Sequence, residues 1–152
     1  MNEIAIRPAC LDDWPTIVEF NCRLAEESED TTLDTGDVEP GVRRLLEDPA
    51  KGRYFVACDG EQIVGQLMHT REWSDWRNGD IWWLQSVYIH PDYRRRGVFR
   101  RLFEALFAEA DADPNVVGLR LYVEADNAPA HATYERFGLN RAGYFVMQRL
   151  FK

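Results

Sequence analysis

Residues 80–103 read DIWWLQSVYIHPDYRRRGVFRRLF, and this stretch decides the fold. It contains a long apolar segment followed by five arginines within eight positions around Gly97. After that glycine, apolar residues recur three and four positions apart, which predicts an amphipathic helix over 98–112. Cations are unfavourable at a helix start, because the free N–H groups of the first turn already carry partial positive charge. A phosphate would resolve this conflict, so the segment predicts an anion-binding loop.

The apolar segment before the arginines predicts a strand whose alternation is irregular. Trp82 and Leu84 have one parity, whereas Val87 and Ile89 have the other. A β-bulge near Gln85–Ser86 would bring all four side chains to one face. A strand that is covered on both faces would need no bulge. Spacing alone leaves these two alternatives open.

The composition bounds the class of protein. The chain has 152 residues, 45% hydrophobic and 29% charged, which predicts a single folded domain over 1–152. Its formal net charge of −8 argues against a nucleic-acid partner, since nucleic-acid-binding domains are usually basic. The sequence has neither a signal-like start nor a window of about 20 apolar residues, so we expect no membrane partner and a cytoplasmic location. Three cysteines without paired spacing predict neither a disulfide framework nor a metal site.

The rest of the sequence predicts strands and helices joined by turns. Asp59–Gly60 and Asn78–Gly79 lie between alternating segments, which is typical of hairpins. Gly138 follows a short helical pattern and predicts its end. The expected strands cover residues 3–9, 53–60, 62–73, 80–91, 117–125 and a segment within 142–151, and the expected helices cover 14–28, 38–48, 98–112 and 127–137.

Two motifs, in this order, resemble the GNAT superfamily of acyl-CoA-dependent N-acyltransferases. The first resembles the family's Gln/Arg-x-x-Gly-x-Gly/Ala loop at Arg94, Gly97 and Phe99, although Phe99 stands where the family usually has glycine or alanine. The second resembles the segment Asn-x-x-Ala-x-x-x-Tyr-x-x-x-Gly-Phe/Leu, and its matching residues are Asn127, Ala130, Tyr134, Gly138 and Leu139. The resemblance implies an α/β (α+β) fold, with a mixed, mostly antiparallel central sheet, about four flanking helices and a splayed, bulged central strand. The sequence after the second motif is short for the family's usual final pair of strands.

The resemblance also implies acetyl-CoA as cosubstrate and no metal. It supplies the missing anion, because the family holds the coenzyme A pyrophosphate at this loop. Backbone amides around Val87, Tyr88 and Ile89 are implied to hold the pantetheine and to polarise the acetyl carbonyl. The residues implied near the phosphates are Arg94, Arg95, Arg96, Gly97, Val98 and Phe99; Asn127 is implied to bind the pantetheine and would also cap its helix.

The catalytic groups come from the same resemblance. Tyr134 is implied to be the general acid that protonates the departing thiolate, whereas spacing alone would favour a core tyrosine on an amphipathic helix. Glu124 is a candidate base on the strand 117–125, and a solvated carboxylate is an equal alternative. Many relatives deprotonate the amine through ordered water, so a dedicated base is not required. Gln85, Glu72 and Glu26 are weaker candidates.

An acidic stretch and a tryptophan-rich hairpin predict where the acceptor binds. We expect Glu26, Glu27, Trp83 and Gln85 to contact a small cationic amine through charge and cation–π interactions. A solvated acidic loop beside core tryptophans is the alternative. The expected function is N-acetyl transfer from acetyl-CoA to a small primary amine. The alternative function is a catalytically silent CoA-binding sensor or interaction module, and the resemblance is also compatible with a homodimer.

Overall fold

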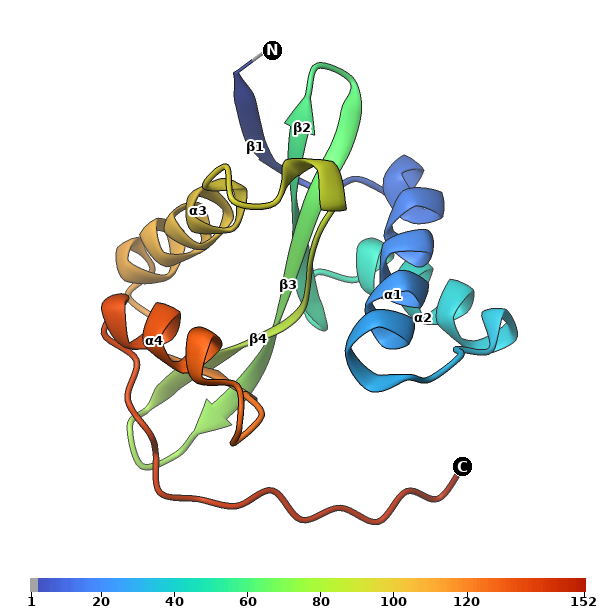
Figure 1. The fold of residues 1–152 in the computed structure, drawn as a ribbon. Helices are drawn as coiled ribbons and strands as arrows, with labels where there is room; N and C mark the ends of the chain where they lie inside the picture. The colour runs from blue at the N-terminus through green and yellow to red at the C-terminus, as the bar shows by residue number, and fades with distance from the viewer. Residues whose placement is uncertain (1–2) are drawn as a thin grey trace. The chain divides into compact units, whose positions relative to one another are not determined.

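The computed structural model describes residues 3–152, which form two compact units that divide after Leu121 (Figure 1). The organisation as one domain over 1–152 stays a prediction. The second unit contains the helix α4 (Ala128–Arg136). The first unit contains, in chain order, β1 (Ile4–Pro8), the 3-10 turn η1 (Leu11–Asp13), α1 (Trp14–Glu29), α2 (Thr35–Glu47), β2 (Gly52–Asp59), β3 (Gln62–Ser74), β4 (Gly79–Ile89), the 3-10 turn η2 (Pro91–Tyr93), α3 (Val98–Ala112) and β5 (Val116–Leu121).

The five strands form one sheet in the order β1-β2-β3-β4-β5. Neighbouring strands are antiparallel except for the parallel pair β4 and β5. Tight turns join β2 to β3 and β3 to β4, and Gly60 and Asn78 adopt positive φ there (60° and 52°). Both residue types tolerate this conformation. Gly60 begins the two-residue turn between Asp59 and Gln62, whereas the turn between Ser74 and Gly79 has four residues and ends with Asn78. The mixed, mostly antiparallel α/β fold is therefore confirmed.

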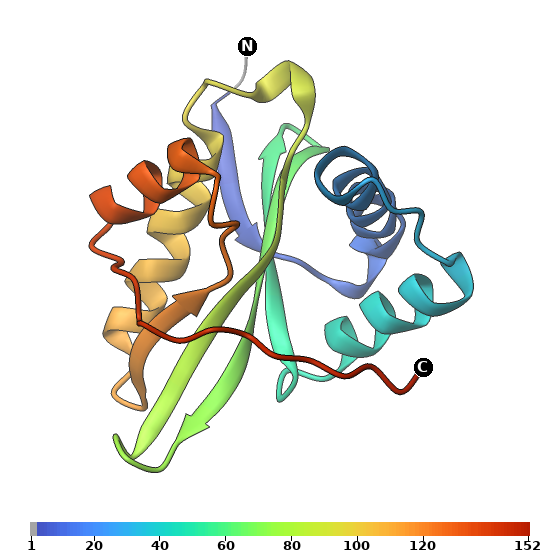
Figure 2. The same cartoon turned by 60° about the horizontal axis from the view of Figure 1, so that its bottom comes forward.

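Helices cover both faces of the sheet within the first unit (Figures 1 and 2). α1 and α2 lie on one face, where Ile17 packs against Tyr54 and Met68. α3 lies on the other face, where a Cβ added to Gly65 would come within 3.2 Å of Val98. The sheet therefore has an apolar layer on each side. Within the sheet, β4 lies between β3 and β5 and is not an edge strand.

A β-bulge interrupts β4 at Ser86. Gln66 of β3 pairs with Tyr88, and Met68 pairs with Gln85, so one residue of β3 opposes two residues of β4. Ser86 has φ 53°, which is unusual for a residue other than glycine. The bulge expected near Gln85–Ser86 is confirmed.

The bulge changes which side chains of β4 share a face. Leu84 pairs with His69, and Ile89 pairs with Gly65. His69 and Gly65 have the same parity on β3, so Leu84 and Ile89 lie on the same face although their own parities differ. The alternative was a strand covered on both faces, and the sheet is indeed covered on both. The register nevertheless requires the bulge.

The end of the chain differs from expectation. β5 ends at Leu121, which pairs with Leu84 just before the bulge, whereas a strand to residue 125 was expected. A bulge bends and twists its strand, so β4 diverges from β5 beyond that pair. The strand expected within 142–151 is also wrong, because residues 140–152 form neither helix nor strand. Backbone groups of a strand need a partner strand, and the described chain pairs none with this segment.

The helices largely match expectation. α3 covers residues 98–112 as predicted, and α1 extends one residue beyond the predicted range. α2 begins at Thr35 rather than at residue 38, because the Asp34 side chain accepts a hydrogen bond from the Gly36 amide (2.8 Å) and caps the helix. Within the described residues, no helix is long and apolar enough to cross a membrane.

The helix α4 has a well-defined cap at each end. The Asn127 side chain accepts from the Ala130 amide (3.1 Å) at its start. At its end, Gly138 has φ 85°, and its amide donates to Glu135, while the Leu139 amide donates to the Tyr134 carbonyl. This double pattern is a Schellman motif, which glycine favours. The predicted capping asparagine and terminating glycine are both confirmed.

Candidate active site

The segment that connects β4 to α3 has the geometry of an anion-binding helix start. Gly97 is the N-cap residue of α3 and has φ 77°, and Arg95 also lies in the left-handed region at φ 64°. A Cβ placed on Gly97 would meet no atom within 4 Å, so the space around this turn is open. The first amides of α3, from Val98 onward, have no partner within the helix and carry partial positive charge. The turn and these amides form a site suited to phosphate.

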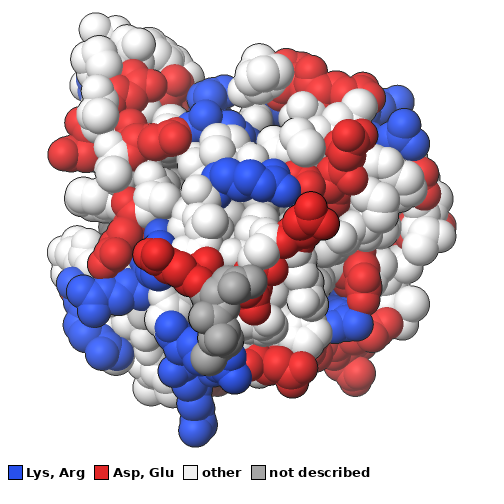
Figure 3. Space-filling model, turned by 90° about the horizontal axis from the view of Figure 1, so that it is seen from above, with Lys and Arg blue, Asp and Glu red and all other residues white. Residues whose placement is uncertain are grey.

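Four of the five arginines interact with the protein itself. Arg94 pairs with Glu27 (2.8 Å), Arg100 pairs with Glu104 (2.8 Å), and Arg101 lies 3.9 Å from Glu3. The Arg96 guanidinium lies over the Tyr93 ring at 5.3 Å. Arg95 is exposed. In the view of Figure 3, arginine and lysine side chains lie among carboxylates and do not form one continuous basic patch.

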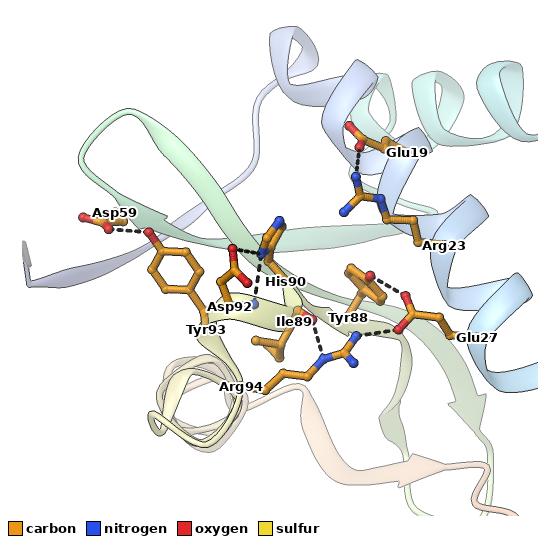
Figure 4. A network of polar contacts seen from close by, with 10 residues as sticks. All are labelled: Glu19, Arg23, Glu27, Asp59, Tyr88, Ile89, His90, Asp92, Tyr93 and Arg94. Atoms are coloured by element: carbon orange, nitrogen blue, oxygen red, sulfur yellow. Dashed lines mark hydrogen bonds and ion pairs between the residues drawn. The ribbon is translucent and has the colours of Figure 1, made fainter.

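Glu27 of α1 connects the end of β4 to the segment 90–97 between β4 and α3, here called the arginine loop (Figure 4). One carboxylate oxygen accepts from the Tyr88 hydroxyl (2.5 Å), and the other accepts from Arg94 (2.8 Å). The Arg94 Nε also donates to the Ile89 carbonyl (2.9 Å), and its guanidinium lies 5.4 Å from the Tyr88 ring centre. Hydrogen bonds from Tyr88 and Arg94 lower the pKa of Glu27, while burial and then Glu27 raise the pKa of Tyr88. Glu27 is thus ionised and already paired.

The pantetheine candidates lie where β4 leaves β5. The two strands pair only as far as Leu84 and Leu121, so Val87, Tyr88 and Ile89 have no pairing with β5. Tyr88 is buried and its ring lies 5.0 Å from that of Phe20 on α1. Amides that are freed on one side of a strand in this way can donate to a ligand.

The acceptor candidates on β4 belong to a polar strip on the face that α1 and α2 cover. Gln85 donates to the Thr70 hydroxyl (2.6 Å). The Trp83 indole donates to Glu72 (3.2 Å), whose second oxygen accepts from Arg120 (2.7 Å). Arg120 therefore neutralises Glu72, which was a weak candidate base. Thr70 and Arg120 were not predicted, because their roles depend on cross-strand pairs that spacing within one strand does not reveal.

The remaining carboxylate candidates are exposed. Glu26 is exposed on α1, next to Glu27. Glu124 is exposed and lies beyond the end of β5, so the argument that placed it on a strand face does not hold. Its carbonyl oxygen lies 2.9 Å from the His131 Nε2. The role of Glu124 as a base stays a prediction.

Tyr134, the candidate acid, is partly buried on α4. Burial raises the pKa of its hydroxyl, which keeps the proton in place at neutral pH. A proton donor must hold its proton until the leaving group forms, so this direction suits an acid. Among the described residues there is no cluster of three or more His, Cys, Asp or Glu side chains that would hold a metal ion.

Comparisons with known proteins agree with this geometry. The chain is 44% identical to a possible acetyltransferase from Clostridium difficile 630 whose crystal structure superposes with a TM-score of 0.91 and covers 98% of each chain. It is 30% identical over 106 residues to an N-alpha-acetyltransferase of Saccharolobus solfataricus, and the aligned residues cover 61% of this chain and 62% of that protein. It is 29% identical over 147 residues to a mycothiol acetyltransferase of Catenulispora acidiphila, and the aligned residues cover 95% of this chain and 45% of that protein. The chain thus spans about half of the length of these curated relatives.

A sequence model of the acetyltransferase (GNAT) family matches residues 14–139, from the start of α1 to the residue after Gly138. This range contains β4, the arginine loop and α4. The chain belongs to the acetyltransferase (GNAT) family.

Proposed function

We propose that this chain transfers the acetyl group of acetyl-CoA directly to a primary amine. One observation carries the proposal: a bulged strand that separates from its parallel neighbour leads directly into a glycine-capped helix start with exposed arginine. The separated strand exposes backbone donors to an acyl group, and the helix start offers a site for phosphate. The family membership supports the same reaction.

The arginine loop fits the phosphates of coenzyme A. The space around Gly97 is open, and the amides of Val98 and Phe99 lie in the first turn of α3. Phe99 is half-buried, and its ring centre lies 6.0 Å from that of Phe103 one turn later. The ring that replaces the family's small residue therefore packs along the helix, and its backbone amide can still donate to an anion.

The reaction requires the protein to stabilise the developing oxyanion, to protonate the departing sulfur and to accept a proton from the amine. Acetyl-CoA supplies an activated acyl group as a thioester. Backbone amides of Val87 to Ile89 would stabilise the negative charge that develops on the carbonyl oxygen. Tyr134 would donate its proton to the departing sulfur. Ordered water or Glu124 would accept the proton of the amine, and no covalent enzyme intermediate is needed.

The acceptor in this proposal is a small amine that approaches along the face of β4 that carries Trp83 and Gln85. Glu26 is exposed and available to attract a cation, whereas the charge of Glu27 is already balanced by Arg94. The relatives are named for different molecules: one is a mycothiol acetyltransferase, and another is an N-acetyltransferase of an alanine of ribosomal protein bS18. A cytoplasmic location and a homodimer stay predictions.

The test is thiol release from acetyl-CoA across a panel of amines, with coenzyme A affinity measured by calorimetry in parallel. Tyr134→Phe removes the proposed acid, and Tyr144→Phe, an exposed tyrosine of the same unit, is the matched control. We expect turnover with at least one amine, lost in Tyr134→Phe and kept in Tyr144→Phe, with unchanged coenzyme A affinity. Coenzyme A binding without turnover on any amine would favour the second candidate, a CoA-binding sensor. Absence of binding would refute both.

A further inference from the structure

The bulge in β4 places Ser86 in a conformation that must be held from outside. Its φ of 53° lies in the left-handed region, which costs free energy for every residue type except glycine. Such residues persist where the surrounding structure over-determines them, and they cluster at functional sites. The contacts that hold Ser86 therefore bear on the amides that follow it.

Three side chains from three elements form a network that ends at Ser86. The Gln66 Nε2 of β3 donates to the Ser86 carbonyl (3.1 Å) and to the Asn21 Oδ1 of α1 (2.8 Å). The Asn21 Nδ2 donates to the Tyr54 hydroxyl of β2 (3.1 Å). Burial raises the pKa of Tyr54, and the neighbouring Asn21 and Ser86 side chains lower it. Ser86 is thus held at its carbonyl by Gln66, which is itself held by Asn21, and Asn21 by Tyr54.

We propose that Asn21, Tyr54 and Gln66 form a clamp that positions the β4 bulge for acetyl transfer. They are positioning residues, because they act through Ser86 and do not contact the reacting atoms. This inference rests on the proposed function, in which the amides after Ser86 stabilise the developing oxyanion. A misdirected amide would weaken that stabilisation without removing the binding site for the phosphates.

The location of the clamp argues against a role in packing alone. Gln66 is fully buried and Tyr54 is 3% exposed, on the sheet face where the neighbouring Met68 and Ile17 are apolar. The Gln66 Oε1 has no hydrogen-bond partner within the described residues, which is costly in a buried position. An apolar residue of the same length would fill the space without this cost. The glutamine is explained if its other atom, Nε2, must hold the Ser86 carbonyl.

The clamp also joins β4 to α1 at a second point. Asn21 lies on the same helix as Glu27, which holds the Tyr88 hydroxyl and Arg94. α1 therefore fixes β4 on both sides of Val87, through the Ser86 network before it and through Tyr88 after it. A displacement of α1 would be transmitted to the Val87 amide from both directions.

The experiment compares Gln66→Met, which keeps the length of the side chain and removes its hydrogen bonds, with Met68→Leu, a matched apolar change on the same strand and face. Steady-state kinetics give kcat and the KM for acetyl-CoA separately. Hydrogen exchange of the amides in 86–89 reports on the bulge without any turnover. The double variant Gln66→Met with Ser86→Gly adds a rescue, because glycine adopts positive φ without strain.

We expect Gln66→Met to lower kcat by about 10- to 100-fold with little change in KM for acetyl-CoA. Exchange of the Val87 amide should rise by about fivefold or more, the factor that the loss of one hydrogen bond gives. Ser86→Gly should recover most of the lost kcat, and Met68→Leu should change neither quantity. A purely structural role predicts equal effects of Gln66→Met and Met68→Leu and no rescue, and that result would overturn the clamp. If the wild type turns over no amine, the proposed function fails on its own, and the exchange data alone decide whether Gln66 holds the bulge.

Discussion

Replacement of His69 by glutamine should reduce the loss of stability of the fold between pH 7 and pH 5. His69 lies fully buried on β3, and its ring stacks on Trp82 with 3.8 Å between ring centres. Burial, followed by the positive charges of Arg71 and Arg53, lowers the pKa of His69 from 6.5 to about 4. The folded protein therefore holds the neutral imidazole, whereas the unfolded chain binds a proton below pH 6.5.

The sign and size of the effect follow from this difference in pKa. The unfolded state binds more protons than the folded state between pH 6.5 and about 4, so the free energy of unfolding falls as the pH falls through this range. The full difference corresponds to about 3 kcal/mol. Between pH 7 and pH 5, the part that develops is about 2 kcal/mol. Above pH 6.5 the contribution of His69 is constant.

Urea unfolding followed by tryptophan fluorescence at pH 7 and pH 5 measures this difference. Wild type should lose about 2 kcal/mol more than His69→Gln over that interval. His90→Gln, which replaces a partly buried histidine at the turn after β4, serves as the control. Equal losses in wild type and His69→Gln would refute the reasoning. If His69→Gln does not fold, an NMR titration of the His69 ring resonances in the wild type decides instead. A titration midpoint near pH 6.5 would also refute the reasoning.

Three further substitutions test the local geometry. Gly97→Ala forces a Cβ into φ 77° and should lower the free energy of unfolding by about 1–2 kcal/mol and weaken coenzyme A binding; a denaturation midpoint equal to wild type would contradict it. Gly65→Ala places a Cβ 2.9 Å from the Ile89 Cδ1 of β4 and 3.2 Å from the Val98 side chain of α3, so we expect a loss of about 1–3 kcal/mol in the same assay, and a neutral result would contradict it by showing that these side chains move aside at no cost. Asn127→Ala removes the cap on the Ala130 amide and should cost about 1 kcal/mol, seen as faster hydrogen exchange in the first turn of α4, whereas Asn127→Ser should keep most of the protection.

Local patterns predicted the elements that carry the proposed phosphate site. The spacing of apolar residues after Gly97 predicted the bounds of α3, and the change of parity between Leu84 and Val87 offered the bulge as one of two alternatives, which the register between β3 and β4 then decided. Both features depend on neighbours within a few positions, where periodicity and turn chemistry dominate. The caps of α4 at Asn127 and Gly138 were predictable for the same reason.

Contacts between distant segments were not predictable. Gln66 is polar within the otherwise apolar run 63–68, which is a signal of some structural demand, but nothing in that run indicates that Asn21 and Ser86 satisfy it. The strand expected within 142–151 failed because alternation and β-propensity describe how a segment would fit a sheet, and the described chain offers it no partner strand. Glu27 was expected at the acceptor, and the structure shows it paired with Arg94 because α1 brings it beside the end of β4.

The carboxylate partners of the arginines also explain how an acidic protein can maintain a phosphate site. With a formal net charge of −8, a strongly positive field at the loop is not expected, and Arg94, Arg100 and Arg101 each lie near a glutamate. Exposed ion pairs of this kind contribute only about 0–1 kcal/mol each, so a phosphate can take over a guanidinium at small cost. A phosphate would also gain the first amides of α3, which the side-chain carboxylates do not reach in the pairs observed. In the proposed function, the helix start would therefore determine where the phosphate binds, and the arginines would add affinity by exchanging their carboxylate partners for the phosphate.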